Sequence, residues 1–277
     1  MEKYDKLVTV TEAGKHTTIM ELGYRNTKVR TKKLSKDLYC DSDGIVHEYK
    51  HTENRQQSIK SVRKSLNKLC DIINANTADL SRCKWVTLTY KENMTDLDKL
   101  GRDWENFCKR AYRKWGKFKY IWVAEPQARG AWHLHVIMIF EGEAPYIAND
   151  DLYKVWGNGL VNVKKIKGGT DLGLYFTVSL SDMPLKEARE TGIEVDNSKI
   201  SANKKYVKGA RLELYPTDKH FYDRSNGLEL PKKETMTKEQ ADLLVKNMRK
   251  TGGYSKVITD SEGRVINKIS VEEYIDD

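Results

Sequence analysis

One segment of the chain, residues 125–140, reads Glu125-Pro-Gln-Ala-Arg-Gly-Ala-Trp-His133-Leu-His135-Val-Ile-Met-Ile-Phe140. Its proline and glycine predict a turn over residues 126–130, and the run that follows favours a strand. Because residues 119–125 also have the composition of a strand, the two together predict a β-hairpin. Residues 131–140 are apolar on both faces, which is typical of a central strand in a sheet packed by helices.

Two histidines interrupt this apolar strand. Side chains alternate along a strand, so His133 and His135 project from the same face with Cβ atoms roughly 6.5–7 Å apart. Both imidazoles can then reach one ion through metal–nitrogen bonds of about 2.1 Å. The turn returns Glu125 to their side, and two histidines with one carboxylate suit a divalent ion that also holds substrate oxygens. Gln127 is an alternative ligand, or a partner that orients one.

Histidines that merely pack in the core or lie at the surface are the alternative interpretation of this pattern. An isolated His-x-His would favour that alternative. Here the carboxylate, the turn and the two histidines coincide on an otherwise apolar strand, and the coincidence favours a metal site.

The segments on either side of the hairpin predict alternating helices and strands. Apolar residues recur at three- and four-residue steps from Ile59 to Ile73, which predicts a helix over residues 54–75. The alternating run from Trp85 to Tyr90 predicts a strand over residues 84–90. Thr95 or Asp96 can cap the next helix, which reaches Trp115. Downstream we expect a helix, a strand and a helix over residues 149–156, 160–166 and 171–180.

This order of elements, β-α-β-β-α-β-α, is that of the split βαβ, ferredoxin-like plan. The sequence therefore predicts an α+β fold with an antiparallel sheet, helices on one face, and N- and C-terminal additions. We expect an N-terminal polar segment plus helix over residues 1–80, a central domain over 81–227 and an extension over 228–277. That extension should contain a helix near residues 237–250 and a small hairpin around Glu262-Gly263.

Composition narrows the class of protein. Of 277 residues, 49 are Lys or Arg and 40 are Asp or Glu, and the resulting net charge of +9 is compatible with a polyanionic partner. No run approaches the roughly 18 apolar residues of a membrane span, and the first residues lack the apolar core of a signal peptide. We therefore expect a cytoplasmic protein with no membrane partner. The four cysteines form no Cys-x-x-Cys pair, which favours reduced thiols over a zinc or disulfide scaffold.

Three segments together resemble the HUH endonucleases, most closely the rolling-circle replication initiators of plasmids and phages of Gram-positive bacteria. They are Trp85-Val-Thr-Leu-Thr-Tyr90, the segment from Glu125 to His135, and Asp171-Leu-Gly-Leu-Tyr175-Phe-Thr177. A later piece, Lys204-Lys-Tyr-Val-Lys-Gly-Ala-Arg-Leu-Glu-Leu-Tyr-Pro216, is also similar. The second segment is specific to that superfamily, whereas the first and third gain weight from their order and spacing. The resemblance covers roughly residues 55–227.

The resemblance implies an HUH endonuclease domain that nicks single-stranded or hairpin origin DNA. It implies that His133, His135 and Glu125 hold Mg²⁺ or Mn²⁺. It also implies that Tyr175 attacks a phosphodiester, forms a covalent 5′-phosphotyrosine link and allows later strand transfer and religation. A phenol with a pKa of about 10 is a poor nucleophile at neutral pH, so a nearby cation suits this chemistry.

The tyrosine motif departs from the family pattern. Many relatives carry a lysine three or four residues after the tyrosine, or a second tyrosine four residues later, where this chain has Val178 and Ser179. A single nucleophile is therefore implied. Tyr206, between Lys205 and Lys208, has the basic neighbours that Tyr175 lacks and is the alternative nucleophile.

Basic side chains near these motifs are candidate DNA contacts. The first cluster is interleaved with aromatic residues that can stack on unpaired bases, although a basic helix end also suits the helix dipole. The candidates are Lys109, Arg110, Arg113, Lys114, Lys164, Lys165, Lys204, Lys205, Lys208 and Arg211.

The sequence leaves rival functions open. A transposase or plasmid relaxase would use the same chemistry, and a DNA-binding regulator on the same fold would use the histidines structurally. Covalent capture of DNA separates an enzyme from a regulator. The chain has no Gly-x-x-x-x-Gly-Lys-Ser/Thr run, so we expect no helicase activity and a dependence on a host helicase and single-strand-binding protein.

Overall fold

The computed structural model describes residues 6–24, 31–49, 55, 59–127, 130–164, 166, 172–190, 200–201, 205–217 and 219–276. The chain forms two compact units, Met1–Thr52 with Lys232–Asp277, and Glu53–Pro231. The three consecutive segments expected from the sequence divide the chain differently, because the two ends of the chain share one unit.

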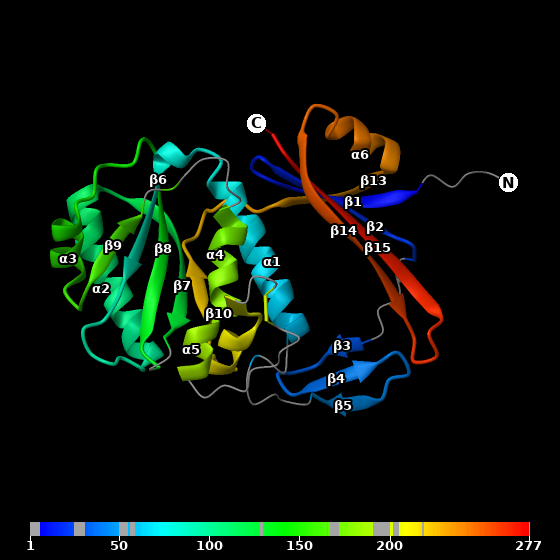
Figure 1. The fold of residues 1–277 in the computed structure, drawn as a ribbon, viewed down its shortest axis with the longest axis horizontal. Coiled ribbons are helices and arrows are strands. Elements are labelled where there is room, and N and C mark those ends of the chain that lie inside the picture. Colours follow the sequence, from blue (N-terminus) through cyan, green and yellow to red (C-terminus); the bar gives the residue numbers. More distant parts are fainter. Residues whose placement is uncertain are drawn as a thin grey trace. The chain divides into compact units, whose positions relative to one another are not determined.

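The unit Glu53–Pro231 is built on a five-stranded antiparallel sheet (Figure 1). The strand order is β12-β7-β8-β6-β9, and each neighbouring pair is antiparallel. The bounds are β6 (Cys83–Leu88), β7 (Phe118–Pro126), β8 (Trp132–Phe140), β9 (Val161–Lys164) and β12 (Tyr222–Arg224). The predicted hairpin, β7–β8, is confirmed, and β8 lies in the middle of the sheet as its apolar character indicated.

Five helices belong to the described part of this unit. They are α1 (Ile59–Asn76), α2 (Leu97–Trp115), α3 (Asn149–Trp156), α4 (Leu172–Ser181) and α5 (Leu185–Glu190). The α2 helix begins where Asp96 accepts hydrogen bonds from the backbone N–H groups of Asp98 and Lys99, as its sequence predicted. The α3 bounds also match the prediction.

Helices cover both faces of the sheet, so the prediction of helices on one face was wrong. On one face, Trp104 of α2 packs against Trp122 of β7 with ring centroids 6.4 Å apart. On the opposite face, Phe176 of α4 packs against Trp85 of β6 at 5.0 Å. Figure 1 shows α2 and α3 on one side of the sheet and α4 with α1 on the other. The alternating pattern of β6 and β7 gives each strand a large aromatic residue to bury, and burial on both faces requires helices on both faces.

Helix α4 is held against α1 by an unusually close approach. The backbone N–H of Gly173 donates to Asn74 Oδ1 at 3.0 Å. A Cβ at position 173 would lie 2.5 Å from the carbonyl oxygen of Cys70, so a larger residue would force the helices apart. This contact fixes α4 over the sheet face that carries the histidines.

A small subdomain follows α4. Strand β10 (Met183–Pro184) pairs with β11 (Tyr206–Val207), and the 3₁₀ helix η4 (Ala210–Leu214) comes next. Met183, Ala188, Val207 and Ala210 form its buried core. Another 3₁₀ turn, η2 (Leu80–Arg82), precedes β6.

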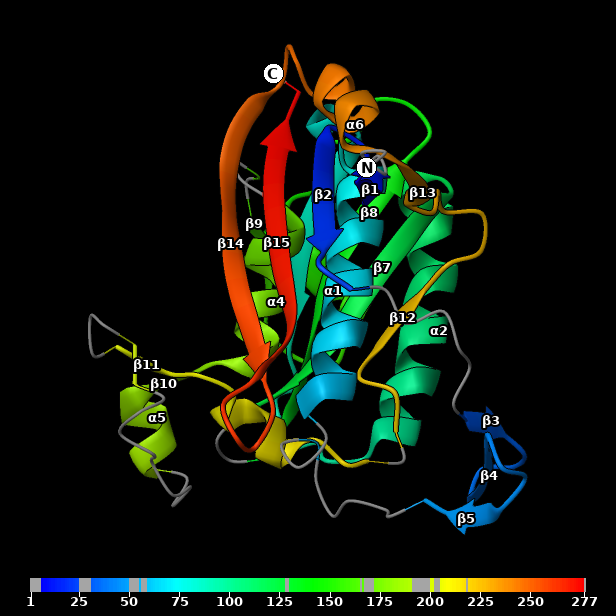
Figure 2. The same cartoon turned by 90° about the vertical axis from the view of Figure 1, so that its right-hand side faces the viewer.

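The second unit is also dominated by antiparallel strands. Its five-stranded sheet has the order β13-β1-β2-β15-β14, and Figure 2 shows most of these strands side by side. The bounds are β1 (Leu7–Ala13), β2 (His16–Leu22), β13 (Lys232–Thr237), β14 (Arg249–Thr259) and β15 (Val265–Ile275). A separate three-stranded sheet joins β3 (Thr31–Lys33), β4 (Leu38–Asp41) and β5 (Val46–Glu48).

Two expectations for the C-terminal extension need correction. Helix α6 (Lys238–Leu244) ends well before residue 250, because the chain from Arg249 onward pairs with β15. The hairpin around Glu262-Gly263 is not small, since each of its strands spans 11 residues. No helix in the described ranges is long and apolar enough to cross a membrane.

Candidate functional site

The β7–β8 hairpin brings Glu125, His133 and His135 together. Its register pairs Glu125 with His133, and His135 lies two residues further along the same face of β8. The candidate ligand atoms of these three residues all lie within 4.8 Å of one another, so the group could hold a metal ion. The predicted return of Glu125 to the histidines is therefore present in the structure.

Both imidazoles direct Nε2 toward one carboxylate oxygen. Glu125 Oε2 lies 2.7 Å from His135 Nε2 and 3.2 Å from His133 Nε2. Only the first contact has the geometry of a hydrogen bond, and His133 Nε2 is buried without a partner in the described part of the chain. A buried ring nitrogen without a partner costs free energy unless another group, such as a cation, uses its lone pair. The three residues therefore fit a divalent ion.

The other ring nitrogen of each histidine contacts a polar side chain. Thr87 Oγ1 of β6 lies 3.2 Å from His135 Nδ1, and Gln127 Nε2 lies 3.3 Å from His133 Nδ1. A histidine that binds metal through Nε2 carries its hydrogen on Nδ1, so these partners should accept it. The Thr87 hydroxyl can accept directly, and Gln127 can accept once its amide turns by 180°. Gln127 thus contacts a ligand, which fits the second of its two predicted roles.

Arg211 is buried beside the same carboxylate. Its Nη1 lies 3.1 Å from Glu125 Oε1, donates to the Pro126 carbonyl at 2.8 Å, and lies 3.2 Å from Glu187 Oε1. The residue is only 4% exposed. The prediction that Arg211 contacts DNA was wrong, because η4 turns its side chain into the site. A lone cation between Ala210 and Leu212 was the only signal in the sequence.

These contacts set the charges of the group. Burial raises the pKa of Glu125, but hydrogen bonds from the two histidines and the charge of Arg211 outweigh it and hold the pKa well below 4.5. Burial lowers the pKa of His135 from 6.5, with the nearby His133 and Lys164 adding to the effect and Glu125 opposing it. Glu125 is therefore ionised and His135 neutral at pH 7, which are the forms that bind a metal.

We expect Arg211→Ala to destabilise the protein strongly. It would leave Glu125 and Glu187 without their shared cation, and breaking a buried ion pair costs about 3–5 kcal/mol. Arg211→Lys should cost less, because it keeps the charge and loses the planar fork. Urea unfolding of each variant measures the loss. The control is Arg113→Ala on the exposed face of α2, which should stay within about 0.5 kcal/mol of wild type. An Arg211→Ala variant as stable as this control would contradict the assignment.

Helix α4 places the candidate nucleophile motif next to the histidines. The Phe176 ring lies 6.2 Å from the His135 ring, measured between centroids. Tyr175 precedes Phe176 in this helix, and its side chain lies outside the described residues. Tyr206, the alternative nucleophile, is 46% exposed on β11. The choice between the two stays a prediction.

The candidate DNA contacts separate into different environments. Arg110 donates from Nε to the Val155 carbonyl at 2.7 Å and from Nη2 to the Trp156 carbonyl at 3.0 Å, so it ties α2 to the end of α3. Lys114 pairs with Asp151 at 2.7 Å. These two side chains serve the packing of α2 on α3.

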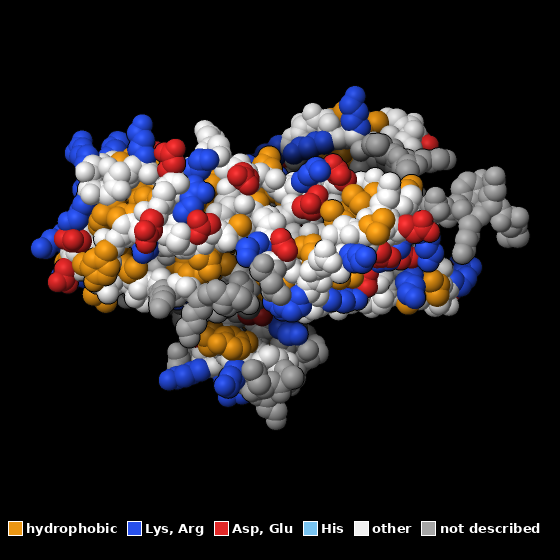
Figure 3. All heavy atoms as spheres, turned by 90° about the horizontal axis from the view of Figure 1, so that it is seen from above, with side chains coloured by type: hydrophobic (Ala, Val, Ile, Leu, Met, Phe, Trp, Pro, Cys, Tyr) orange, Lys and Arg blue, Asp and Glu red, His pale blue; other side chains and the backbone are white. Residues whose placement is uncertain are grey.

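The remaining cations are more accessible. The exposed ones are Lys109, Arg113, Lys205 and Lys208. Lys164 lies on the face of the histidines, with Nζ 4.9 Å from the centre of the Trp85 ring. Lys165 and Lys204 lie outside the described residues. On the face in Figure 3, cationic and acidic side chains are both present, so charge alone does not mark a binding surface there.

The comparisons with known proteins point to one family. The family model of the replication-associated protein ORF2 matches residues 83–182. The matched region begins with β6 and ends after α4, so it contains the three candidate ligands and position 175. Neither the curated proteins nor the solved structures yield a match. The family match is consistent with a replication initiator.

Proposed function

We propose that this protein initiates rolling-circle DNA replication as an HUH nickase. It cuts single-stranded or hairpin origin DNA at a specific site, keeps the 5′ phosphate on a tyrosine, and later transfers or religates the strand. The observation that carries this proposal is the convergence of His133 Nε2 and His135 Nε2 on Glu125 Oε2. The match of residues 83–182 to a replication-associated family supports the same function.

The fold supports this proposal. The order β6-α2-β7-β8-α3-β9 follows the β-α-β-β-α-β pattern of ferredoxin-like folds, and its sheet is antiparallel. We assign the chemistry to the unit Glu53–Pro231, which contains both the candidate ligands and α4.

Glu125, His133 and His135 would hold the metal, and Mg²⁺ or Mn²⁺ suits a carboxylate combined with imidazoles. The bound ion would orient a phosphate oxygen and neutralise its charge. The chain itself prepares the site, because Arg211 occupies Glu125 Oε1 and leaves Oε2 facing the histidines. Thr87 and Gln127 hold the imidazole rings from behind.

Tyr175 supplies the nucleophile in this proposal. Its phenolic oxygen forms a bond to phosphorus while the bond from phosphorus to the 3′ oxygen breaks. The phenol loses its proton to solvent and the 3′ oxygen gains one, which leaves a free 3′ hydroxyl and a 5′-phosphotyrosine. Attack by a 3′ hydroxyl reverses the step and reseals the strand without ATP.

The test is covalent capture. Purified full-length protein is incubated with Mn²⁺ and single-stranded DNA from the parent replicon, and the mixture is analysed on a denaturing gel. We expect a protein–DNA band that survives denaturation. A protein that binds this DNA but never forms the band would be a DNA-binding regulator, and the proposed enzyme would be wrong.

We further expect no DNA-stimulated ATP hydrolysis by the purified protein. The sequence lacks the phosphate-binding loop of a helicase motor, so a host helicase should separate the strands and a host single-strand-binding protein should cover them. A phosphate-release assay with and without single-stranded DNA measures this directly. ATP turnover that rises on addition of DNA would contradict this expectation.

A further inference from the structure

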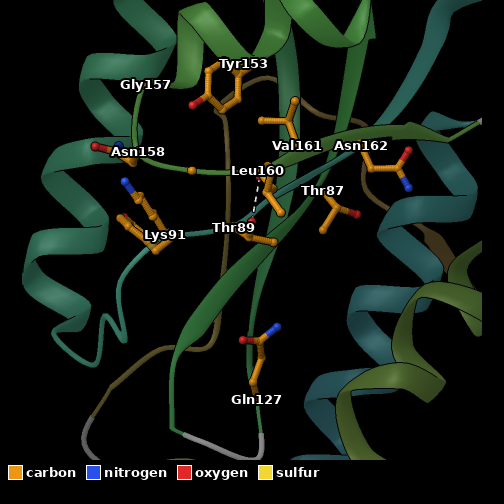
Figure 4. Close-up of a pocket in the computed structure, with 12 residues that line it drawn as sticks. Thr87, Thr89, Lys91, Gln127, Tyr153, Gly157, Asn158, Leu160, Val161 and Asn162 are labelled. Carbon is orange, nitrogen blue, oxygen red and sulfur yellow. Dashed lines mark hydrogen bonds between the residues drawn. The ribbon is translucent and has the colours of Figure 1, made fainter.

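A groove of about 710 Å³ opens next to the candidate metal site (Figure 4). One end is lined by Thr87 and Gln127, the two side chains that contact the histidines. From there it extends along the C-terminal end of β6 and the start of β9, toward Tyr153 at the end of α3. The groove is therefore continuous with the site.

Strand register places the groove on the same sheet face as the histidines. His135 pairs with Thr87, and Thr87 pairs with Asn162 across β6 and β9. Directly paired residues project from the same face, so these three side chains form one row across the sheet. A strand of DNA with a phosphate at His135 would thus have its next nucleotide over Thr87 and Asn162.

The floor of the groove is rigid. Thr89 donates from both its backbone N–H and its hydroxyl to the Leu160 carbonyl, at 2.9 and 2.8 Å. A Cβ at Gly159 would lie 2.5 Å from the backbone nitrogen of Lys91, so the two backbones pack directly against each other. This floor exists without a ligand and needs no rearrangement to bind one.

The lining of the groove suits an unpaired base. Leu160 is 74% exposed and Tyr153 is 52% exposed, which is unusual for apolar side chains beside a functional site. The amides of Asn158 and Asn162 make no hydrogen bond within the described ranges and lie along the same groove. Flat apolar surface bordered by these amides and by the ammonium of Lys91 matches a base, its edge and its phosphate.

We infer that this groove binds an unpaired nucleotide adjacent to the phosphate that is cut. The inference rests on the proposed function and adds a binding site to it. Tyr153 and Leu160 contact the face of the base, Asn158 and Asn162 bind its edge, and Lys91 binds the backbone. Asn158 and Asn162 are thereby the candidates for reading sequence next to the nick.

Binding experiments without metal test the groove. The probes are fluorescein-labelled oligothymidylate of about 12 nucleotides and an abasic oligomer of equal length, with EDTA present. We expect Tyr153→Ala to weaken binding of oligothymidylate about tenfold and to leave binding of the abasic oligomer unchanged. Lys91→Ala should weaken both probes and lower the salt dependence by about one phosphate contact.

The matched control is Tyr146→Ala. Tyr146 is 87% exposed in the same unit but does not line the groove, so its loss should change neither affinity. Asn162→Asp provides a second variant, because a carboxylate in the row should repel DNA without disturbing an exposed position. Circular dichroism checks that each variant is folded. If Tyr153→Ala and Asn162→Asp both bind oligothymidylate as tightly as the Tyr146 control, the groove assignment is wrong.

A covalent-capture assay with the same variants separates this inference from the proposed function. If wild type forms the covalent band and the groove variants bind normally, the nickase stands and the groove is wrong. If the groove variants lose binding and wild type forms no band, the groove is right and the nickase is wrong.

Discussion

The Tyr175→Phe variant should form no covalent DNA adduct and should not nick. Phenylalanine keeps the ring and removes only the oxygen that would attack phosphorus, so the free energy of unfolding should change little. The nicking rate should fall by at least about 10⁴-fold, the order found when other enzymes lose a covalent nucleophile. The measurement is the covalent band on a denaturing gel, followed over time with Mn²⁺ and single-stranded DNA of the parent replicon.

The control for this variant is Tyr206→Phe. Tyr206 has basic neighbours and is exposed, but we expect its adduct to form at the wild-type rate. Digestion of the trapped wild-type complex and mass spectrometry identify the modified peptide. An adduct on the Tyr206 peptide, or on any residue outside 171–181, would overturn the assignment of Tyr175 and leave the metal site intact.

Replacing either histidine should abolish nicking while DNA binding persists. His133→Ala or His135→Ala removes one of the candidate ligands, and the remaining groups should no longer retain the ion. Most phosphate and base contacts lie elsewhere, so affinity for oligothymidylate in EDTA should stay near wild type. Mn²⁺ titration by calorimetry should show the loss of binding directly, and EDTA should have the same effect on the wild-type protein until Mg²⁺ or Mn²⁺ is restored.

His220→Ala is the matched control for these variants. His220 is an exposed histidine of the same unit outside the cluster, and its loss should leave both Mn²⁺ binding and nicking unchanged. Nicking at the full rate in EDTA would show that the three-residue metal site is wrong. Histidine variants that fail to fold would instead favour a purely structural role for the two rings.

Local sequence signals predicted the hairpin and much of the sheet around it. The spacing of His133 and His135 fixes their common face, and a short turn brings Glu125 back, so the cluster depends on only eleven consecutive residues. Helix α2 was equally predictable, since Asp96 caps it and its apolar positions recur at helical spacing. Features of this kind depend on few residues that are close in sequence.

Features that depend on distant contacts were not predictable. Arg211 lies far from Glu125 in sequence, and only the packing of η4 against the hairpin buries its guanidinium. The alternation of Thr9 with Val8 and Val10 is a weak strand signal, but the partners of β1 include a strand from the other end of the chain. The groove likewise needs the close approach of Gly159 to Lys91. No local pattern specifies these meetings.

The pairing of the two chain ends has a consequence for synthesis on the ribosome. Strand β1 pairs with β13, where Val8 lies opposite Met236, and β2 pairs with β15. At about 5–20 residues per second, a ribosome needs roughly 10–45 s to make the partner of β1 after β1 itself. Throughout that interval the β1–β2 hairpin has two unpaired edges, and by its end every strand within Glu53–Pro231 has been made. A nascent chain can therefore complete the unit Glu53–Pro231 first and close the terminal sheet last.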